Sequence, residues 1–275
     1  SMSMRNLSAA GLRHSTCRYI FFILPLLFCL VTAAEAADGR TVEEGQKENP
    51  VTADAARVGS PPSLTVPDNF SPQPLLGPGA ELSMVTIYPG EALYSTFGHT
   101  AIRVWDPSSG IDRLFHYGQS SVPFDSGFVP NFVSGYLPFM LGVIDTERAY
   151  DFYTRYEDRS IVEQVLDLTR EEKQRLYRFL SYNALPENRV YIYDFFFDNC
   201  TTRVRDIFTL LYGEELVYRL PRQQQSFREE ISPYLRATPY VHLGINLMFG
   251  IPSDRRPQLK DRLYLPFQLM EAIEE

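Results

Sequence analysis

Cysteine is scarce in this sequence, which has 3 cysteines among 275 residues. Two of them, Cys17 and Cys29, lie in an N-terminal segment that has the pattern of a cleavable leader. Removal of that segment would leave Cys200 alone, and a single cysteine cannot form an internal disulfide. An unpaired thiol is a liability in an oxidising compartment, so the retention of Cys200 indicates that the thiol is used.

Positive charge and the common cofactor motifs are also lacking. The formal net charge is −8, which argues against a nucleic-acid binder and against electrostatic docking on anionic lipid. There is no P-loop, no G-x-G-x-x-G and no G-x-S-x-G motif. Only 4 histidines are present, and no closely spaced His or Cys pair offers the ligands of a zinc site. We therefore expect no cofactor, no metal, no nucleic acid and no stable protein partner.

The N-terminal segment resembles a secretory signal peptide. Arginines precede an apolar run at residues 19–33, and Ala34-Glu35-Ala36 is an A-x-A cleavage pattern. The run is short for a membrane span and contains Pro25. We predict that residues 1–36 are a signal peptide and that the chain is exported.

The remainder divides into a linker and one domain. Residues 37–79 are rich in Pro, Gly, Ser and acidic residues, and we predict a disordered linker there because few apolar groups are available for burial. No second linker interrupts residues 80–275, so we predict a single catalytic domain.

A β-hairpin is predicted by alternating residues at 98–105 and 111–117. A four-residue loop at 106–109 would place His99 directly opposite His116 on one face of the sheet. Either histidine alone is an ordinary strand residue. Two on one face, with an unpaired cysteine elsewhere, indicate a site.

Other segments are assigned from periodicity, turn residues and capping signals. The apolar stretch at 243–252 is expected to pack in the core, and His242 is taken as structural. We predict strands at 82–88, 161–168 and 189–197, a loop at 124–143, and helices at 145–157, 169–182 and from Cys200 to a stop at Gly213.

Cys200 falls in the first turn of the last of these helices. Asp198 or Asn199 can cap the helix through a side-chain oxygen. Val204, four residues on, leads the apolar face, so Cys200 should lean toward the buried side. The positive end of the helix dipole favours thiolate, whereas a buried cysteine can also serve as a small hydrophobic residue.

Cysteine and histidine together allow nucleophilic catalysis on acyl compounds. His99 can take the thiol proton, and His116 can fix the tautomer of that ring. Backbone N–H groups at the start of the Cys200 helix would form an oxyanion hole, with the Thr201 and Thr202 hydroxyls as weaker donors.

Three blocks carry a family resemblance: residues 95–104 (STFGHTAIRV), 115–118 (FHYG) and 193–203 (YDFFFDNCTTR). They resemble the Lnb N-terminal periplasmic domain family, which is similar to circularly permuted papain-like enzymes such as lecithin:retinol acyltransferase. The resemblance implies an α+β fold of permuted papain-like type. In that fold, an antiparallel sheet packs against the cysteine-bearing helix, with extra C-terminal helices.

The resemblance also implies an activity and its residues. Cys200 would be the nucleophile, His99 the base and His116 the group that orients it. Matching positions that would bind substrate or support the site are Asn199, Asp198, Thr201, Arg103 and Ser95.

The expected protein is a periplasmic thiol acyltransferase or hydrolase. It would work through an acyl-cysteine intermediate on the acyl group of a lipid or lipoprotein, with association with the membrane left open. Two alternatives remain: a cell-wall cysteine amidase or peptidase, and a non-catalytic envelope binding module.

Overall fold

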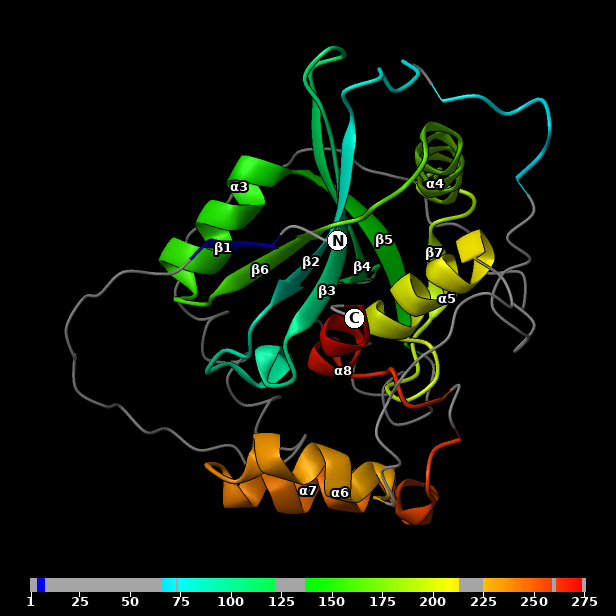
Figure 1. The fold of residues 1–275 in the computed structure, drawn as a ribbon. Helices are drawn as coiled ribbons and strands as arrows, with labels where there is room; N and C mark the ends of the chain where they lie inside the picture. Colours follow the sequence, from blue (N-terminus) through cyan, green and yellow to red (C-terminus); the bar gives the residue numbers. More distant parts are fainter. Residues whose placement is uncertain are drawn as a thin grey trace, which may run out of the picture.

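β-branched and aromatic runs between residues 81 and 192 form six of the seven strands of an antiparallel sheet in the described residues (Figure 1). The computed structural model describes residues 4–7, 66–72, 74–121, 137–212, 225–258 and 261–273. The strand order is β1-β6-β2-β3-β4-β5-β7, and all neighbours are antiparallel. The strands are β1 (Met4–Leu7), β2 (Glu81–Ile87), β3 (His99–Asp106), β4 (Ile111–Ser120), β5 (Pro138–Asp145), β6 (Ile161–Val165) and β7 (Val190–Ile192).

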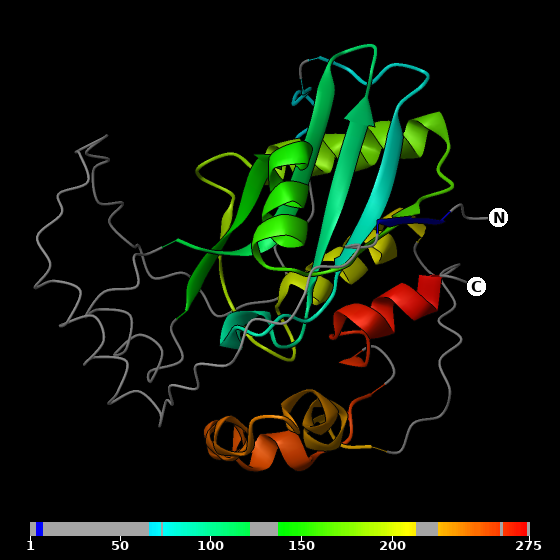
Figure 2. The same cartoon turned by 90° about the vertical axis from the view of Figure 1, so that its left-hand side faces the viewer.

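Helices cover both faces of the sheet and add a further layer at one end (Figure 2). The α-helices are α3 (Thr146–Asp151), α4 (Arg170–Asn183), α5 (Cys200–Tyr212), α6 (Phe227–Ile231), α7 (Pro239–Phe249) and α8 (Pro266–Ile273). Shorter helical turns are η1 (Leu93–Ser95), the π-helical η2 (Phe152–Tyr156), η4 (Ser232–Leu235) and η5 (Ile251–Asp254).

Two separate cores result from the alternation of the strands. Ile102 and Val104 of β3 face the cluster that contains apolar residues of α4, α5 and α8. Ala101, on the opposite face, belongs to the smaller cluster that contains Ala149 of α3. The predicted mixture of an antiparallel sheet and helices is confirmed, and the permuted papain-like connection stays a prediction.

The predicted hairpin forms, but its register differs by two positions. The turn occupies residues 107–110, Asp106 pairs with Ile111, and Ala101 rather than His99 lies opposite His116. Asp106 is the physical reason, because its carboxylate accepts hydrogen bonds from the turn serines and keeps this residue at the end of the strand. A shift of two keeps side chains on the same face, so the prediction of a shared face is confirmed.

Three further predictions are corrected by the structure. The predicted loop at 124–143 includes most of β5, which pairs with β4 and β7; residues 122–136 lie outside the described ranges. The predicted strand at 189–197 is confined to β7, because Asp194 accepts hydrogen bonds from two backbone N–H groups and turns the chain.

The third correction concerns residues 243–252. Most of this stretch belongs to α7 and its apolar side chains do not all pack inward, since Leu243, Leu247 and Ile251 are exposed. The predicted capping box at Thr169 is confirmed, and α3 with η2 occupies the predicted helix at 145–157.

The structure describes only part of the predicted signal peptide and linker. Residues 66–72 and 74–79, the last part of the predicted linker, contact the domain: Arg178 of α4 donates to the Phe70 carbonyl, and Leu76 is buried. Residues 4–7, within the predicted signal peptide, form β1 along β6. The rest of residues 1–65 and Gly213 lie outside the described ranges, so the signal peptide stays a prediction.

Candidate functional site

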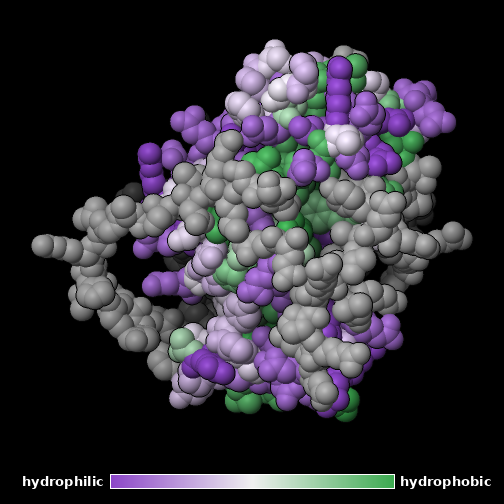
Figure 3. All heavy atoms as spheres, viewed as in Figure 1, coloured by the Kyte–Doolittle hydropathy of each residue, from purple (hydrophilic) through white to green (hydrophobic). Residues whose placement is uncertain are grey.

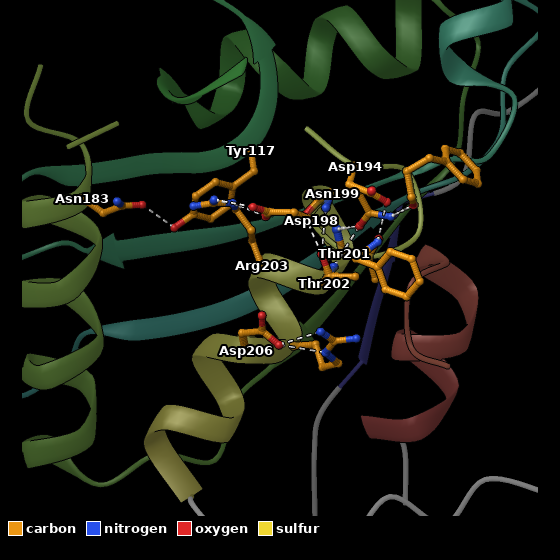
Figure 4. Close-up of polar contacts among 12 residues, drawn as sticks. Tyr117, Asn183, Asp194, Asp198, Asn199, Thr201, Thr202, Arg203 and Asp206 are labelled. Carbon is orange, nitrogen blue, oxygen red and sulfur yellow. Dashed lines mark hydrogen bonds and ion pairs between the residues drawn. The ribbon is translucent and has the colours of Figure 1, made fainter. Parts of the chain in front are cut away.

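The first turn of α5 is held by Asn199, which is therefore the helix cap (Figure 4). Its Oδ1 accepts the backbone N–H groups of Thr201 at 2.8 Å and Thr202 at 2.9 Å. Its own N–H donates to the Thr202 hydroxyl at 2.7 Å, and its Nδ2 donates to the carbonyls of Phe195 and Tyr264. Asn199 is buried, and its hydrogen bonds to residues before and after Cys200 fix the position of Cys200.

The preceding residue, Asp198, serves the fold rather than the thiol. It forms a two-point ion pair with Arg203, at 2.6 and 2.8 Å, and Figure 4 shows these side chains pointing toward each other. The Arg203 guanidinium lies 3.7 Å from the centre of the Tyr191 ring. Burial raises the pKa of Asp198, against the Arg203 charge that lowers it. This network joins α5 to β7.

A buried hydroxyl pair connects α5 to β3 beside the two candidate catalytic residues. The Thr100 and Thr201 hydroxyls lie 3.1 Å apart, and both side chains are buried. Each threonine directly follows a candidate residue, Thr100 after His99 and Thr201 after Cys200. The Thr201 hydroxyl also lies 3.8 Å from the Cys200 sulfur, so its role as a weak oxyanion donor stays a prediction.

His99 and Cys200 both lie beside Gly118, although they are far apart in sequence. A Cβ on Gly118 would lie 3.7 Å from Cε1 of the His99 ring and 3.9 Å from Cβ of Cys200. Gly118 has a φ of 95°, and the β4–β5 register shifts between His116 and Gln119. The positive φ and the register shift suit a glycine, so β4 presents no side chain beside the imidazole and the thiol-bearing residue.

His116 lies beside His99 but forms no hydrogen bond with it among the described residues. The two rings meet edge to face with 5.8 Å between their centroids. A Cβ on Gly142 of β5 would lie 2.6 Å from Nε2 of His116, so the ring occupies the space that a side chain there would need. The predicted role of His116 as an orienting group remains a prediction.

The electrostatics favour neutral forms of both reactive groups. Burial, together with the charges of His116 and Arg159, lowers the pKa of His99 to about 3. Burial raises the pKa of the Cys200 thiol, although N–H groups of Thr100, Thr201 and Cys200 itself and the Thr201 hydroxyl act in the opposite direction. The resting thiol is therefore protonated, in contrast to the thiolate that the helix dipole alone predicts.

The oxyanion donors are also fewer than predicted. The N–H groups of Thr201 and Thr202 already donate to Asn199. The N–H groups of Cys200 and Thr100, both directed at the thiol, are the candidates that avoid this cap.

Tyr153 and Arg159 join the site without any signal in the sequence. The Tyr153 ring of η2 lies 6.5 Å from the His99 ring, and the Arg159 guanidinium lies 5.3 Å from the Tyr153 centroid. Arg159 is buried, pairs with Glu157 at 2.7 Å and donates to the Tyr88 carbonyl. Burial raises the pKa of Tyr153 to about 12, so its hydroxyl keeps its proton. The pattern of residues 145–157 shows only an apolar helix face.

Two matched residues lie away from the thiol. Arg103 pairs with Asp112 and Glu163 on the α3 side of the sheet, which makes it part of a structural ion network. The Ser95 hydroxyl donates to the Ala92 carbonyl and stabilises the η1 turn. In the described ranges, no group of three or more His, Cys, Asp or Glu side chains is arranged to hold a metal ion.

Comparison with known families adds one finding. Residues 78–224, more than half of the chain, match the Lnb N-terminal periplasmic domain. The chain belongs to this family. The matched region of the Lnb domain contains Cys200, His99 and His116, whereas α6, α7 and α8 follow it. No curated protein and no solved structure matches the chain.

The family name describes a periplasmic domain, in agreement with the localisation predicted from the sequence. Among the helices of the described residues, none is both long and apolar enough to cross a membrane.

Proposed function

We propose that this Lnb-family domain is a periplasmic thiol acyltransferase or hydrolase with Cys200 as nucleophile and His99 as base. The observation that carries the proposal is that the His99 ring and Cys200 both lie beside Gly118. The hydroxyls of Thr100 and Thr201, 101 residues apart in sequence, join the two elements that hold them. A purely structural cysteine would not need an imidazole, a side-chain-free strand position and a helix start around one point.

In the first step, the neutral imidazole of His99 takes the proton of the Cys200 thiol as sulfur attacks an ester carbonyl. A C–S bond forms, and the oxyanion accepts hydrogen bonds from the N–H groups of Cys200 and Thr100. The C–O bond of the ester then breaks, and the proton on His99 passes to the leaving alcohol oxygen. A low pKa for His99 suits this last transfer, because the desolvated imidazolium is a strong acid.

In the second step, an amine or a water molecule attacks the thioester. His99 accepts the proton of that nucleophile, the C–S bond breaks, and the proton returns to sulfur. The acyl group leaves as an amide or as a free acid, and the enzyme regains its neutral pair. This sequence is the permuted papain-like chemistry that the family resemblance implies.

A mass measurement tests the covalent step. The protein is incubated with phospholipid in mixed micelles and its intact mass is recorded before an amine acceptor is added. We expect wild-type protein to gain one acyl chain, Cys200→Ala to gain none, and His99→Gln to acylate at least about a hundredfold more slowly. Consumption of lipid by wild-type protein, with no thioester adduct in its intact mass before the acceptor is added, would refute the proposal.

A parallel incubation separates the cell-wall alternative. Release of peptides from peptidoglycan by wild-type protein, lost in Cys200→Ala, with no reaction on lipid would select an amidase that uses the same residues. Unchanged behaviour of both variants on every substrate would leave a non-catalytic module.

A further inference from the structure

Helix α7 has its polar side chains turned toward the protein. His242 Nε2 lies 3.3 Å from the Ser232 hydroxyl of η4. Arg228 of α6 donates to the Asn246 side chain at 2.7 Å and to the Gly250 carbonyl at 2.7 Å. The polar groups that normally face water on a surface helix are thus used to attach α7 to α6 and η4.

Apolar side chains occupy the outer surface of the same helix. Leu243 and Leu247, one turn apart, are 60% and 71% exposed, and Tyr240, one turn before them, is 65% exposed. Ile251, just beyond the end of α7, is 85% exposed. In Figure 3 a few hydrophobic groups appear at the lower edge of the molecule, among hydrophilic ones, where α6 and α7 lie in Figure 1. We call Tyr240, Leu243, Leu247 and Ile251 the outer stripe.

Arginines stand at both ends of the outer stripe. Arg236 precedes α7, and Arg255 and Arg256 follow η5; all are exposed. Asp254, next to Arg255 in sequence, is paired with Arg228, and the charge of Arg256 acts on one further carboxylate, Glu229 of α6. An exposed apolar helix between basic ends matches a membrane interface with anionic headgroups. The net charge of the whole chain opposes such docking, whereas the charge around this stripe favours it.

We infer that the outer stripe docks on the surface of a bilayer that contains anionic phospholipid. The apolar side chains would enter the boundary between headgroups and acyl chains, while the arginines contact phosphate groups. The helix would lie in the plane of the membrane and would not cross it.

The opposite side of α7 leads directly to the candidate site. Val241, Ile245 and Phe249 belong to the aromatic cluster that contains Phe97 and Phe195. Phe97 lies two residues before His99, and the Phe195 carbonyl accepts a hydrogen bond from Asn199, the cap of the Cys200 helix. Docking through α7 would therefore hold the site one aromatic layer from the lipid surface.

A second copy of the chain is a less favourable occupant of this face than an anionic bilayer. Both ends of the outer stripe are basic, so parallel or antiparallel pairing of two copies would bring arginines together. Such like-charge contacts cost binding free energy, whereas anionic headgroups are attracted to them.

Vesicle flotation tests the inference with full-length protein exported to the periplasm of a bacterial host. The vesicles contain phosphatidylcholine alone or with phosphatidylglycerol. We expect wild-type protein to bind the anionic vesicles. Leu243→Gln/Leu247→Gln should reduce the ratio of bound to free protein at least about tenfold. Arg236→Gln/Arg256→Gln should reduce it roughly fivefold for each arginine on anionic vesicles only.

Matched variants define the outcome. Leu75→Gln removes a leucine that is 56% exposed outside α7, and Cys200→Ser removes the thiol; both should bind as wild type does. Binding by Cys200→Ser would persist even if the proposed chemistry failed, so the two ideas are tested separately. Equal flotation of Leu243→Gln/Leu247→Gln and wild type would overturn the inference. So would absent wild-type binding, or a wild-type dimer in light scattering that these substitutions convert to monomer.

Discussion

The depressed pKa of His99 makes a quantitative prediction about stability in acid. The folded protein holds this imidazole neutral down to a pKa of about 3, whereas the unfolded chain has the ordinary value of 6.5. As pH falls below about 6.5, the unfolded state takes up a proton that the folded state refuses, so stability is lost. Between about pH 6.5 and pH 4, at roughly 1.4 kcal/mol per unit, the loss is about 3 kcal/mol.

The perturbation is His99→Gln, which removes this proton uptake while keeping a neutral polar side chain. Chemical denaturation of both proteins at several pH values gives the free energy of unfolding. We expect the wild type to lose about 3 kcal/mol more than His99→Gln between pH 7 and pH 4, a large part of the stability of a typical domain. The lowered pKa of His116 acts in both proteins and cancels in the difference.

Two features of the data check this reasoning. Above pH 7.5 the ring is neutral in both the folded and unfolded states, so the two proteins should show parallel pH dependence there. Equal losses on acidification would mean that His99 takes a proton freely in the folded protein. The depressed pKa of His99, and the strongly acidic imidazolium that the mechanism uses, would then be excluded.

Three other predictions follow from the same site. The rate of alkylation of Cys200 by iodoacetamide, followed by peptide mass, should rise with pH. At neutral pH it should be slower than the rate for a free thiol, because burial raises the pKa of Cys200. A rate that stays constant into the acid range would instead indicate a thiolate paired with an imidazolium. Thr201→Val should lower the free energy of unfolding by about 1–3 kcal/mol in chemical denaturation, because it leaves the Thr100 hydroxyl unpaired. The double variant Thr100→Val/Thr201→Val should recover part of this loss. Losses of stability that simply add would contradict the pairing. Gly118→Ala and Gly110→Ala should each destabilise by about 1–2 kcal/mol through their positive φ, but Gly118→Ala alone should slow acylation; equal activity would contradict the placement of Gly118.

Periodicity predicted which side chains share a face, but not which residues lie opposite each other. Alternation along β3 and β4 is unchanged by a shift of two, so His99 and His116 were placed together correctly while their pairing was wrong. The actual register depends on hydrogen bonds from the turn to Asp106, including one from Gly77, which lies in the predicted linker. A local pattern does not contain such a contact.

The candidate site shows the same division between local and long-range effects. Capping chemistry and helix periodicity predicted that Cys200 opens a helix and leans inward, because both depend on neighbours within one turn. The charge state of the thiol depends on how far the elements packed against α5, among them β3 and β4, shield it from water, which no local pattern reports. Arg159 illustrates this, since it influences His99 only through the fold.

The partial burial of Cys200 bears on the difficulty that one unpaired cysteine presents in a chain predicted to be exported. Oxidants attack thiolate, and the desolvation that raises the pKa of Cys200 disfavours that form. A low-pKa base beside it does not remove the proton at rest, because His99 gains little by becoming charged in the same desolvated space. Reaction then requires a carbonyl that accepts the negative charge as it leaves sulfur. An acyl chain delivered from a lipid surface would supply that carbonyl and keep water away from the proton transfer, so the protected thiol, the neutral imidazole and the outer stripe of α7 are parts of one consistent arrangement.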